Sequence, residues 1–353
     1  MKKTRSAKTA AGVALLAVTG LVASACTSTS SGDTANTVSV VGFSVLQQAN
    51  DAEFKAFQGT DAGKGVQFAP SYGPSGDQSR SVAGGAKADV VHFSLEPDMK
   101  RLVDANLVSK DWNTGATKGI ATDSLVVFVV RKGNPKHITS WDDLVKPGVS
   151  VVTPNPGSSG AAKWNLLAAW EHVVGAGGSA AQAKEFVGKL LKNTPVLPAS
   201  GREATSAFVE GNQDVLLAYE DEAIQAKQAG EDIDYVIPND TLLIQNPAAV
   251  TTTASQPAKD FLSFMLSPQG QEIYAGYGFR PVPGVSGVTL PQVKGANDPS
   301  NPFPDPKTLY TVDKNLGGWS TANSKFFNDG SDGNPVGIIS QLIADSGSDA
   351  QDS

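Results

Sequence analysis

The chain has 353 residues, about two domains' worth of sequence, and 40% of them are hydrophobic, so each domain can bury a core of its own. Charged residues make up 18% and aromatic residues 7%, while 36 Gly and 21 Pro supply tight turns; this suits a globular α/β protein and excludes a coiled coil. The net charge of −7 excludes a general binder of nucleic-acid backbones, and the one cysteine excludes a disulfide framework, a cysteine-rich zinc site and an iron–sulfur cluster.

The first 25 residues have the layout of a secretory signal peptide. A cationic start over residues 1–8 precedes an apolar run over 10–22, which is too short for a membrane span. Small residues then lead to Cys26, and the run 22–25 before it resembles a bacterial lipoprotein signal, in which the cysteine becomes the lipidated first residue. Ordinary cleavage after Ala25 is the alternative. Residues 26–37 are rich in Ser, Thr and Gly, which predicts a flexible tether. We therefore expect an exported protein anchored as a lipoprotein to the outer face of the cytoplasmic membrane.

Apolar runs of strand length recur from residue 38 onward, each followed by turn residues and a stretch of helical character. These runs are residues 38–43, 66–69, 88–93, 124–130, 149–153 and 214–218. Continuous apolar strands that alternate with helices are typical of parallel sheets covered on both faces. The sequence therefore predicts an α/β fold. Residues 346–353 are acidic and polar, and we expect a disordered tail there.

Four helices are predicted to begin with serine, each soon after one of these strands. Ser44, Ser75 and Ser200 each stand three residues before Gln or Glu, the spacing of a capping box, and a fourth start lies at 158–161. In an open parallel sheet, strand ends and the following helix N-termini share one rim. Free backbone N–H groups at such a rim bind anions without a lysine. Taken singly, each serine is also explained as an ordinary cap.

Residues that would mark an enzyme are sparse. The histidines His92, His137 and His172 lie in no metal-ligand spacing, and the chain has no nucleophile elbow, no P-loop and no dinucleotide-binding glycine pattern. His92 lies within an apolar run and is interpreted as a core residue. The acidic pairs in 142–143 and 220–222 are assigned to solvated surfaces. The sequence favours a binding protein with no catalytic residue, no metal and no cofactor.

Longer stretches carry more information than these spacings. They are residues 131–136 (RKGNPK), 141–149 (WDDLVKPGV) and 153–170, which runs from TPNP to WNLLAAW, with shorter matches at 86–91, 214–218, 267–271, 279–281 and 317–319. Together they resemble the prokaryotic sulfate-binding protein family, over about residues 38–327. The resemblance implies a two-lobed, type II periplasmic-binding-protein fold, each lobe a mixed, mainly parallel sheet flanked by helices. Lobe 1 would comprise residues 38–120 and 241–345, lobe 2 would comprise 121–240, and the ligand would lie between them.

The family's binding residues fall on the predicted helix starts. Most of them would donate backbone N–H groups, while Ser159 adds a hydroxyl and Tyr219 a side-chain donor. Carried over by motif, the set is Ser44, Ser75, Ser159, Gly160, Ala161, Gly201 and Tyr219. Arg80 and Arg202 would add supporting positive charge one turn behind these donors.

Two departures from the family bear on the choice of anion. Tyr219 stands where the family has a tryptophan whose indole N–H binds an oxyanion oxygen, and a tyrosine hydroxyl can also accept. Glu203 stands where the family has glycine, and we expect it to cap its own helix. Ionised sulfate needs donors only, because a fixed acceptor would repel it, whereas hydrogen phosphate needs one acceptor. Phosphate would fit if Tyr219 or Glu203 accepted a proton from the ligand.

The resemblance thus implies an extracytoplasmic receptor that binds sulfate, or thiosulfate, and delivers it to the permease subunits and cytoplasmic ATPase of an ABC importer. We expect a monomer without a nucleic-acid partner. The alternatives are a receptor for molybdate, tungstate or phosphate, an exported ester hydrolase, and a surface protein without a small ligand.

Overall fold

The computed structural model describes residues 36–331 and 333–347. The predicted signal peptide, Cys26 and most of the predicted tether lie outside the described residues, as does the chain after residue 347. The tether prediction is wrong at Thr37, which begins the first strand, and the tail prediction is wrong at Ser346, which ends the last helix.

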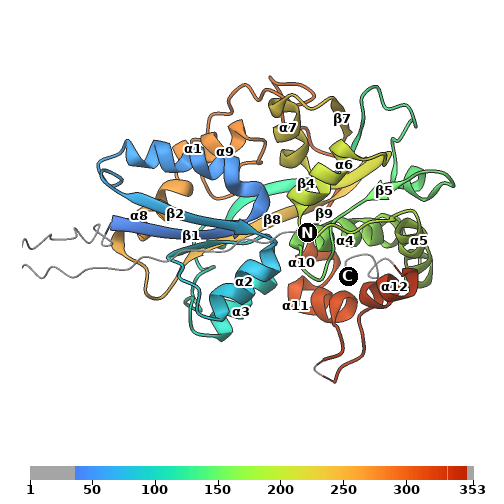
Figure 1. Cartoon of the computed structure of the whole chain (residues 1–353), viewed down its shortest axis with the longest axis horizontal. Helices are drawn as coiled ribbons and strands as arrows, with labels where there is room; N and C mark the ends of the chain where they lie inside the picture. The colour runs from blue at the N-terminus through green and yellow to red at the C-terminus, as the bar shows by residue number, and fades with distance from the viewer. Residues whose placement is uncertain (1–35, 332, 348–353) are drawn as a thin grey trace, which may run out of the picture. The chain divides into compact units, whose positions relative to one another are not determined.

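The described chain contains nine strands (Figure 1). Seven of them follow the order β2-β1-β3-β8-β4-β6-β5, while β7 pairs with β4 and β9 pairs with β8. Each of the six runs that the sequence predicted as strands overlaps one of the nine. The strands are β1 (Thr37–Phe43), β2 (Gln67–Gly73), β3 (Val90–His92), β4 (Ile120–Arg131), β5 (Val151–Val152), β6 (Val215–Tyr219), β7 (Ile233–Val236), β8 (Asp240–Val250) and β9 (Thr308–Tyr310).

The sheet confirms the α/β prediction but is more mixed than expected. Parallel pairings join β1 to β2 and β3, β5 to β6, and β8 to β9. The pairings of β8 with β3 and of β4 with β6, β7 and β8 are antiparallel. Both β4 and β8 are long and pair with several strands. The first half of β4 pairs with the middle of β8, and its second half pairs with β6 and β7. The start of β8 pairs with β9 and its end with β3.

Helices cover both faces of the strands. Figure 1 shows α1, α8 and α9 on one side of β1 and β2, and α2 and α3 on the other. The helices are α1 (Gln47–Gln58), α2 (Ser75–Ala83), α3 (Glu96–Asp104), α4 (Gly160–Gly175), α5 (Ala180–Lys192), α6 (Gly201–Glu210), α7 (Glu220–Ala229), α8 (Gln256–Met265), α9 (Pro268–Gly276), α10 (Val312–Asn315), α11 (Gly318–Ala322) and α12 (Ile338–Ser346). Short 3-10 turns cover Ser44–Leu46 and Trp141–Val145, and a π-turn covers Asn323–Phe327.

Alternate residues of the continuous apolar strands enter different cores. In β1, Val40 belongs to the core that contains α1 and α8 residues, and its neighbour Val41 to the core that contains α2 and α3 residues. In β4, Phe128 packs in the core that includes α4 and α5, whereas Val127 packs with residues of α6 and α7. Because successive side chains of a strand point to opposite faces, a run without polar residues marks a strand buried on both sides. The prediction of strands covered on both faces is confirmed for β1 and β4 and is wrong for β2, most of whose residues are exposed at the end of the strand order.

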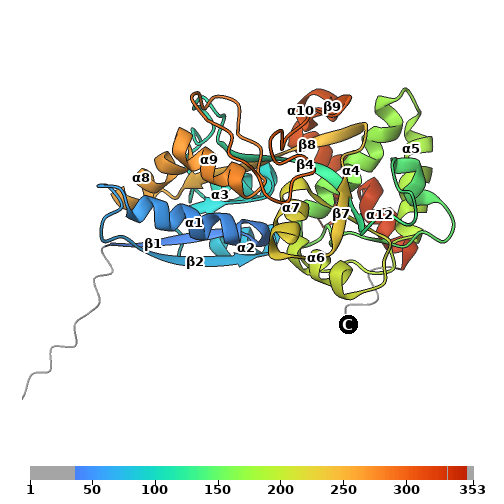
Figure 2. The same ribbon diagram turned by 90° about the horizontal axis from the view of Figure 1, so that it is seen from above.

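The C-terminal helices pack against α4 and α5 (Figures 1 and 2). Trp319 of α11 meets Trp164 of α4 edge to face with ring centroids 4.7 Å apart, and Phe326 meets Trp170 in the same way at 4.8 Å. Such edge-to-face aromatic pairs stabilise a contact beyond the area they bury. The segment after β9 is thereby fixed to α4 rather than to β1 and β2.

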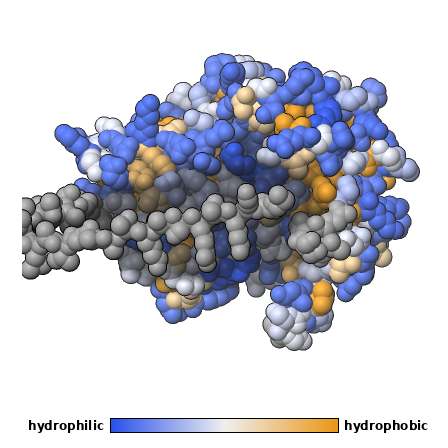
Figure 3. All heavy atoms as spheres, viewed as in Figure 1, coloured by the Kyte–Doolittle hydropathy of each residue, from blue (hydrophilic) through white to orange (hydrophobic). Residues whose placement is uncertain are grey.

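Polar side chains cover most of the face shown in Figure 3. Among the described residues, the large hydrophobic side chains that are exposed are Leu290, Leu309 and Val336. No helix in the described part of the chain combines the length and the apolar character that a bilayer crossing needs.

Candidate functional site

Four element starts meet at one small cavity. The 3-10 turn after β1 begins at Ser44, α2 begins at Ser75, and α4 and α6 begin at Gly160 and Gly201. Six of the seven predicted binding residues line this cavity, and Tyr219 does not. The described residues that line it are Phe43, Ser44, Val45, Gly73, Pro74, Ser75, Ser94, Ser159, Gly160, Ala161 and Gly201. The cavity volume is about 10 Å³, far below that of typical organic-ligand pockets, so the cavity suits at most a ligand of a few atoms.

The arrangement follows from the strand directions. The parallel strands β1, β2 and β3 end side by side, and each is followed by a serine that lines the cavity: Ser44, Ser75 and Ser94. The starts of α4 and α6 supply the opposite wall. The first N–H groups of a helix have no acceptor within it, and the dipole makes this end positive. Converging helix starts therefore form a site for a small anion.

Of the three predicted capping boxes, only that of α6 forms, and only in part, because Glu203 bonds to Ala199 and not to the cap residue Ser200. Ser200 Oγ accepts from the backbone N of Glu203 at 3.2 Å, and Glu203 Oε2 accepts from the backbone N of Ala199 at 3.1 Å. Glu203 is exposed and is not among the residues that line the cavity. It caps its own helix, as expected.

At Ser44 and Ser75 the capping-box prediction is wrong. The turn that Ser44 begins has no side-chain cap, and α1 starts only at Gln47. Ser75 is itself the first residue of α2; its Oγ accepts from Ser94 N at 2.9 Å and donates to Asp98 Oδ2 at 2.7 Å. The Ser75 hydroxyl is committed to these partners, which leaves its backbone N–H for the cavity.

Hydrogen bonds join the two walls around the cavity. Gly76 N donates to Ser158 O at 3.1 Å, and Trp164 Nε1 donates to Ser94 O at 3.0 Å. The walls also approach closely at Gly160, where a Cβ atom would lie 2.6 Å from Ser94 Cβ and closer still to its Oγ. Only glycine fits there, because real Cβ atoms do not approach neighbours below 3.0 Å. The cavity is therefore closed by contacts that a bulkier residue would prevent.

The predicted supporting cations stand beside the cavity. Arg80 pairs with Asp77 and reaches Gly157 O at 3.5 Å, and Arg202 Nε donates to Ser44 O at 3.2 Å. Among the described residues that line the cavity, none is Lys or Arg. Arg80 and Arg202 thus tie the two walls together through backbone carbonyls, and a ligand would be held by uncharged donors.

The acidic run 220–222 is buried, so its assignment to a solvated surface is wrong. Glu220 forms an ion pair with Arg280 at 2.6 Å, and Asp221 accepts from Ser124 Oγ at 2.6 Å. Acidic side chains at the start of α7 also gain from the positive end of the helix dipole. Partners from distant segments allow the burial, which sequence spacing does not reveal.

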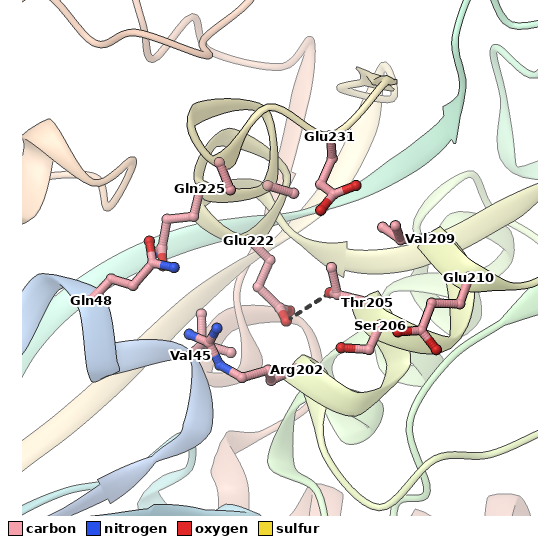
Figure 4. Close-up of a pocket in the computed structure, with 12 residues that line it drawn as sticks. Val45, Gln48, Arg202, Thr205, Ser206, Val209, Glu210, Glu222, Gln225 and Glu231 are labelled. Carbon is pink, nitrogen blue, oxygen red and sulfur yellow. Dashed lines mark hydrogen bonds between the residues drawn. The ribbon is translucent and has the colours of Figure 1, made fainter.

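Glu222 lies directly behind the start of α6 (Figure 4). A Cβ atom at Gly201 would lie 2.9 Å from its Oε1, and its carboxylate accepts from Thr205 Oγ1 at 3.3 Å. Burial raises the pKa of Glu222 to about 7, and the nearby Arg202 opposes that shift. The carboxyl group thus stands close to one end of the cavity without lining it.

Tyr219 lies behind the cavity. Its side chain is fully buried and its Oη lies 2.7 Å from Ser94 Oγ, while Ser94 itself lines the cavity. Sequence reasoning missed Ser94, although it follows an apolar strand as Ser44 does. The sequence shows no capping pattern at this position, because α3 starts at Glu96 and its N-cap residue, Leu95, forms no side-chain cap.

The described residues contain no group of three His, Cys, Asp or Glu side chains that could hold a metal ion. His92 is buried, its Nε2 lies 3.3 Å from Thr122 Oγ1, and burial lowers its pKa to about 3. The interpretation of His92 as a core residue is confirmed, although its Nδ1 has no hydrogen-bond partner.

The pattern of the family described as bacterial extracellular solute-binding protein matches residues 39–280 of the chain. The chain belongs to this family. Sequence comparison agrees with the match: a sulfate-binding protein of Synechococcus elongatus is 40% identical over 83% of this chain and 84% of its own length. A thiosulfate-binding protein of Pseudomonas aeruginosa is 35% identical over 82% of this chain and 86% of its own length.

Structural comparison also finds a sulfate-binding protein that is similar to this solute-binding protein. The sulfate-binding protein SubI of Mycobacterium tuberculosis has 43% identity and a TM-score of 0.76, and the match covers 83% of this chain and all of that one. A periplasmic thiamin-binding protein, with 20% identity and a TM-score of 0.61, shares the fold alone. The relatives are named as binding proteins, which agrees with the prediction that the chain is not an enzyme.

Proposed function

We propose that this solute-binding protein is an extracytoplasmic receptor for sulfate, with thiosulfate as a second ligand, and that the anion occupies the cavity between the four element starts. The observation that carries the proposal is the convergence of six motif-matched residues on a cavity without a lining cation. The names of the relatives support the choice of ligand.

The donors are backbone N–H groups of Ser44, Ser75, Gly160, Ala161 and Gly201, joined by the hydroxyl of Ser159. Ala161 replaces a family glycine without loss, because only its backbone N–H is used. Each hydrogen bond to a charged group contributes about 1.5–3 kcal/mol, against several kcal/mol for dehydrating a buried dianion. About six such bonds support a micromolar or tighter complex.

The same set of donors argues for sulfate over phosphate. Hydrogen phosphate carries a proton that needs an acceptor, and an unmet donor in a buried site weakens binding. No carboxylate is among the described residues that line the cavity, and those beside it are turned to other partners. Asp98 binds Ser75 Oγ and Arg101, Glu203 caps α6, and Glu222 binds Thr205 and the backbone of Tyr219.

The partners and the anchor belong to the same proposal. The receptor works as a monomer, is tethered to the outer face of the cytoplasmic membrane through a lipid on Cys26, and delivers the anion to the permease subunits and cytoplasmic ATPase of an ABC importer. The two lobes are those expected from the sequence, residues 38–120 with 241–345 and residues 121–240, with one change that we propose. Residues 308–346 are assigned to the second lobe instead of the first, because Trp319 and Phe326 pack on tryptophans of α4 and α12 packs on α5. A Cys26→Ser change should release the protein from membranes.

The direct test is calorimetric titration of the chain from Asp33 onward, prepared without sulfate in any buffer. Sulfate, thiosulfate, molybdate and phosphate are added in separate runs at neutral pH. The proposal expects one-to-one binding of sulfate with no signal from phosphate. A preference for phosphate or molybdate would contradict the ligand assignment, and silence from all four anions would exclude an oxyanion receptor.

A further inference from the structure

Ser94 is a cavity-lining residue that the family motif does not include. It is almost fully buried, and its hydroxyl lies against the start of α4, next to Gly160. Its backbone is fixed by two contacts: its N–H donates to Ser75 Oγ at 2.9 Å, and its carbonyl accepts from Trp164 Nε1 at 3.0 Å. The hydroxyl therefore faces the cavity from a rigid position.

Behind Ser94, a chain of hydrogen bonds joins side chains of β3, β4 and β8, each donating to the next. His92 is neutral, so its Nε2 can donate to Thr122 Oγ1, 3.3 Å away. Thr122 Oγ1 donates to Asn246 Oδ1 at 3.1 Å, which leaves the Asn246 amide nitrogen to donate to Ser94 O at 3.0 Å. This pattern fixes which way the Asn246 amide is turned.

The amide nitrogen of Asn246 carries two hydrogens, and Asn246 also bonds to the Tyr219 hydroxyl. Tyr219 Oη accepts that second hydrogen. The Tyr219 hydroxyl is fully buried, and a buried donor needs an acceptor, so we assign its hydrogen to Ser94 Oγ, 2.7 Å away. Burial raises the pKa of Tyr219 well above its ordinary value, so the hydroxyl keeps its hydrogen throughout the physiological pH range. Ser94 Oγ thereby receives a hydrogen bond from behind, and its own hydrogen remains for the cavity.

We infer that Ser94 is a further anion-binding residue and that Tyr219 is a positioning residue, which turns the Ser94 hydroxyl into an obligatory donor. The inference rests on the proposed sulfate site. It explains why a tyrosine, which can accept as well as donate, is compatible with a site that offers donors only: the acceptor capacity of Tyr219 is used by Asn246. The site then selects oxyanions that carry no proton.

The test compares Ser94→Ala, Tyr219→Phe and the double variant with the wild-type chain by calorimetric titration with sulfate and with phosphate. Ser94→Ala should weaken sulfate binding about 10-fold or more, as expected for one hydrogen bond to a charged group. Tyr219→Phe frees Ser94 Oγ to accept, so sulfate binding should weaken and phosphate binding should strengthen, each several-fold. In the Ser94→Ala background, Tyr219→Phe should change sulfate affinity less than 2-fold, because the Ser94 hydroxyl through which Tyr219 acts is already absent.

Tyr235→Phe is the matched control, because Tyr235 is also a buried strand tyrosine, bonded to Asn297 N far from the lining residues. It should leave both affinities unchanged. Melting temperatures in sulfate-free buffer establish that each variant is folded. Wild-type affinity in Ser94→Ala, additive losses in the double variant, or an unchanged ratio of sulfate to phosphate affinity in Tyr219→Phe would each overturn the inference. Failure of the wild-type chain to bind sulfate would instead remove the proposed function.

Discussion

Gly160→Ala should weaken sulfate binding by preventing the walls of the cavity from closing. The added Cβ would lie 2.6 Å from Ser94 Cβ and 2.8 Å from Leu95 Cγ, whereas apolar atoms prefer separations of 3.5–4.0 Å. Ser94 Cβ is attached to the backbone and cannot rotate away, so the start of α4 must move outward by roughly 1 Å. That movement lengthens the bond from Trp164 Nε1 to Ser94 O, which is 3.0 Å long.

Overpacking of this kind costs about 1–3 kcal/mol. At about 1.4 kcal/mol for each factor of ten, sulfate affinity should fall about 5- to 150-fold in a calorimetric titration. Gly188→Ala is the matched control, because its Cβ would lie at an ordinary 3.5 Å from Leu342 Cδ2 in the middle of α5. It should bind sulfate as the wild type does and should melt at the same or a slightly higher temperature. Wild-type sulfate affinity in Gly160→Ala would refute the reasoning, as would an equal loss in the Gly188→Ala control.

Three further changes probe the surroundings of the site. Glu203→Gln should leave sulfate binding unchanged and should produce no binding of phosphate in the titration. The weaker bond to Ala199 N should lower the free energy of unfolding by less than about 1 kcal/mol. A phosphate signal would contradict the assignment of Glu203 to its helix cap. Burial lowers the pKa of His172, but the hydrogen bond and the charge of Asp240 raise it more. The contribution of this pair to the free energy of unfolding is therefore complete below about pH 6.5 and is lost as pH rises through the raised pKa. His172→Gln should flatten that decline in urea unfolding followed against pH, and an unchanged slope would show that other groups cause it. Arg80→Ala should weaken sulfate binding less than about 10-fold, because its charge is paired; a 100-fold loss would indicate direct contact.

The element order and most of the site could be predicted because both depend on local patterns. An apolar run followed by a serine and small residues predicted helix starts near Ser44, Ser75, Gly160 and Gly201, and the family resemblance then assigned their backbone N–H groups to the ligand. These donors belong to the backbone, so the change from a family glycine to Ala161 did not obscure them.

The roles of Tyr219 and Ser94 could not be predicted, because they depend on contacts between distant segments. The two residues are 125 positions apart, and whether the tyrosine reaches the cavity depends on what fills the space in front of it. The prediction that the acids of 220–222 lie on a solvated surface failed for the same reason, because Glu220 is paired with Arg280, 60 positions further along the chain. Likewise, spacing alone did not reveal that the Ser75 hydroxyl is bonded to Asp98, 23 positions away, rather than to its own helix.

A site built from main-chain amides has a consequence for how it can be mapped. Alanine scanning removes side chains, and at Ser44 and Ser75 the amide that we propose as a donor survives every such substitution. A scan would therefore report signals mainly at Ser94 and Ser159, with one at Gly160 that comes from steric overlap and not from the loss of a donor. Replacement of single peptide bonds by esters, introduced by chemical ligation or by α-hydroxy acids, deletes one donor at a time and would reveal the footprint that mutagenesis leaves invisible.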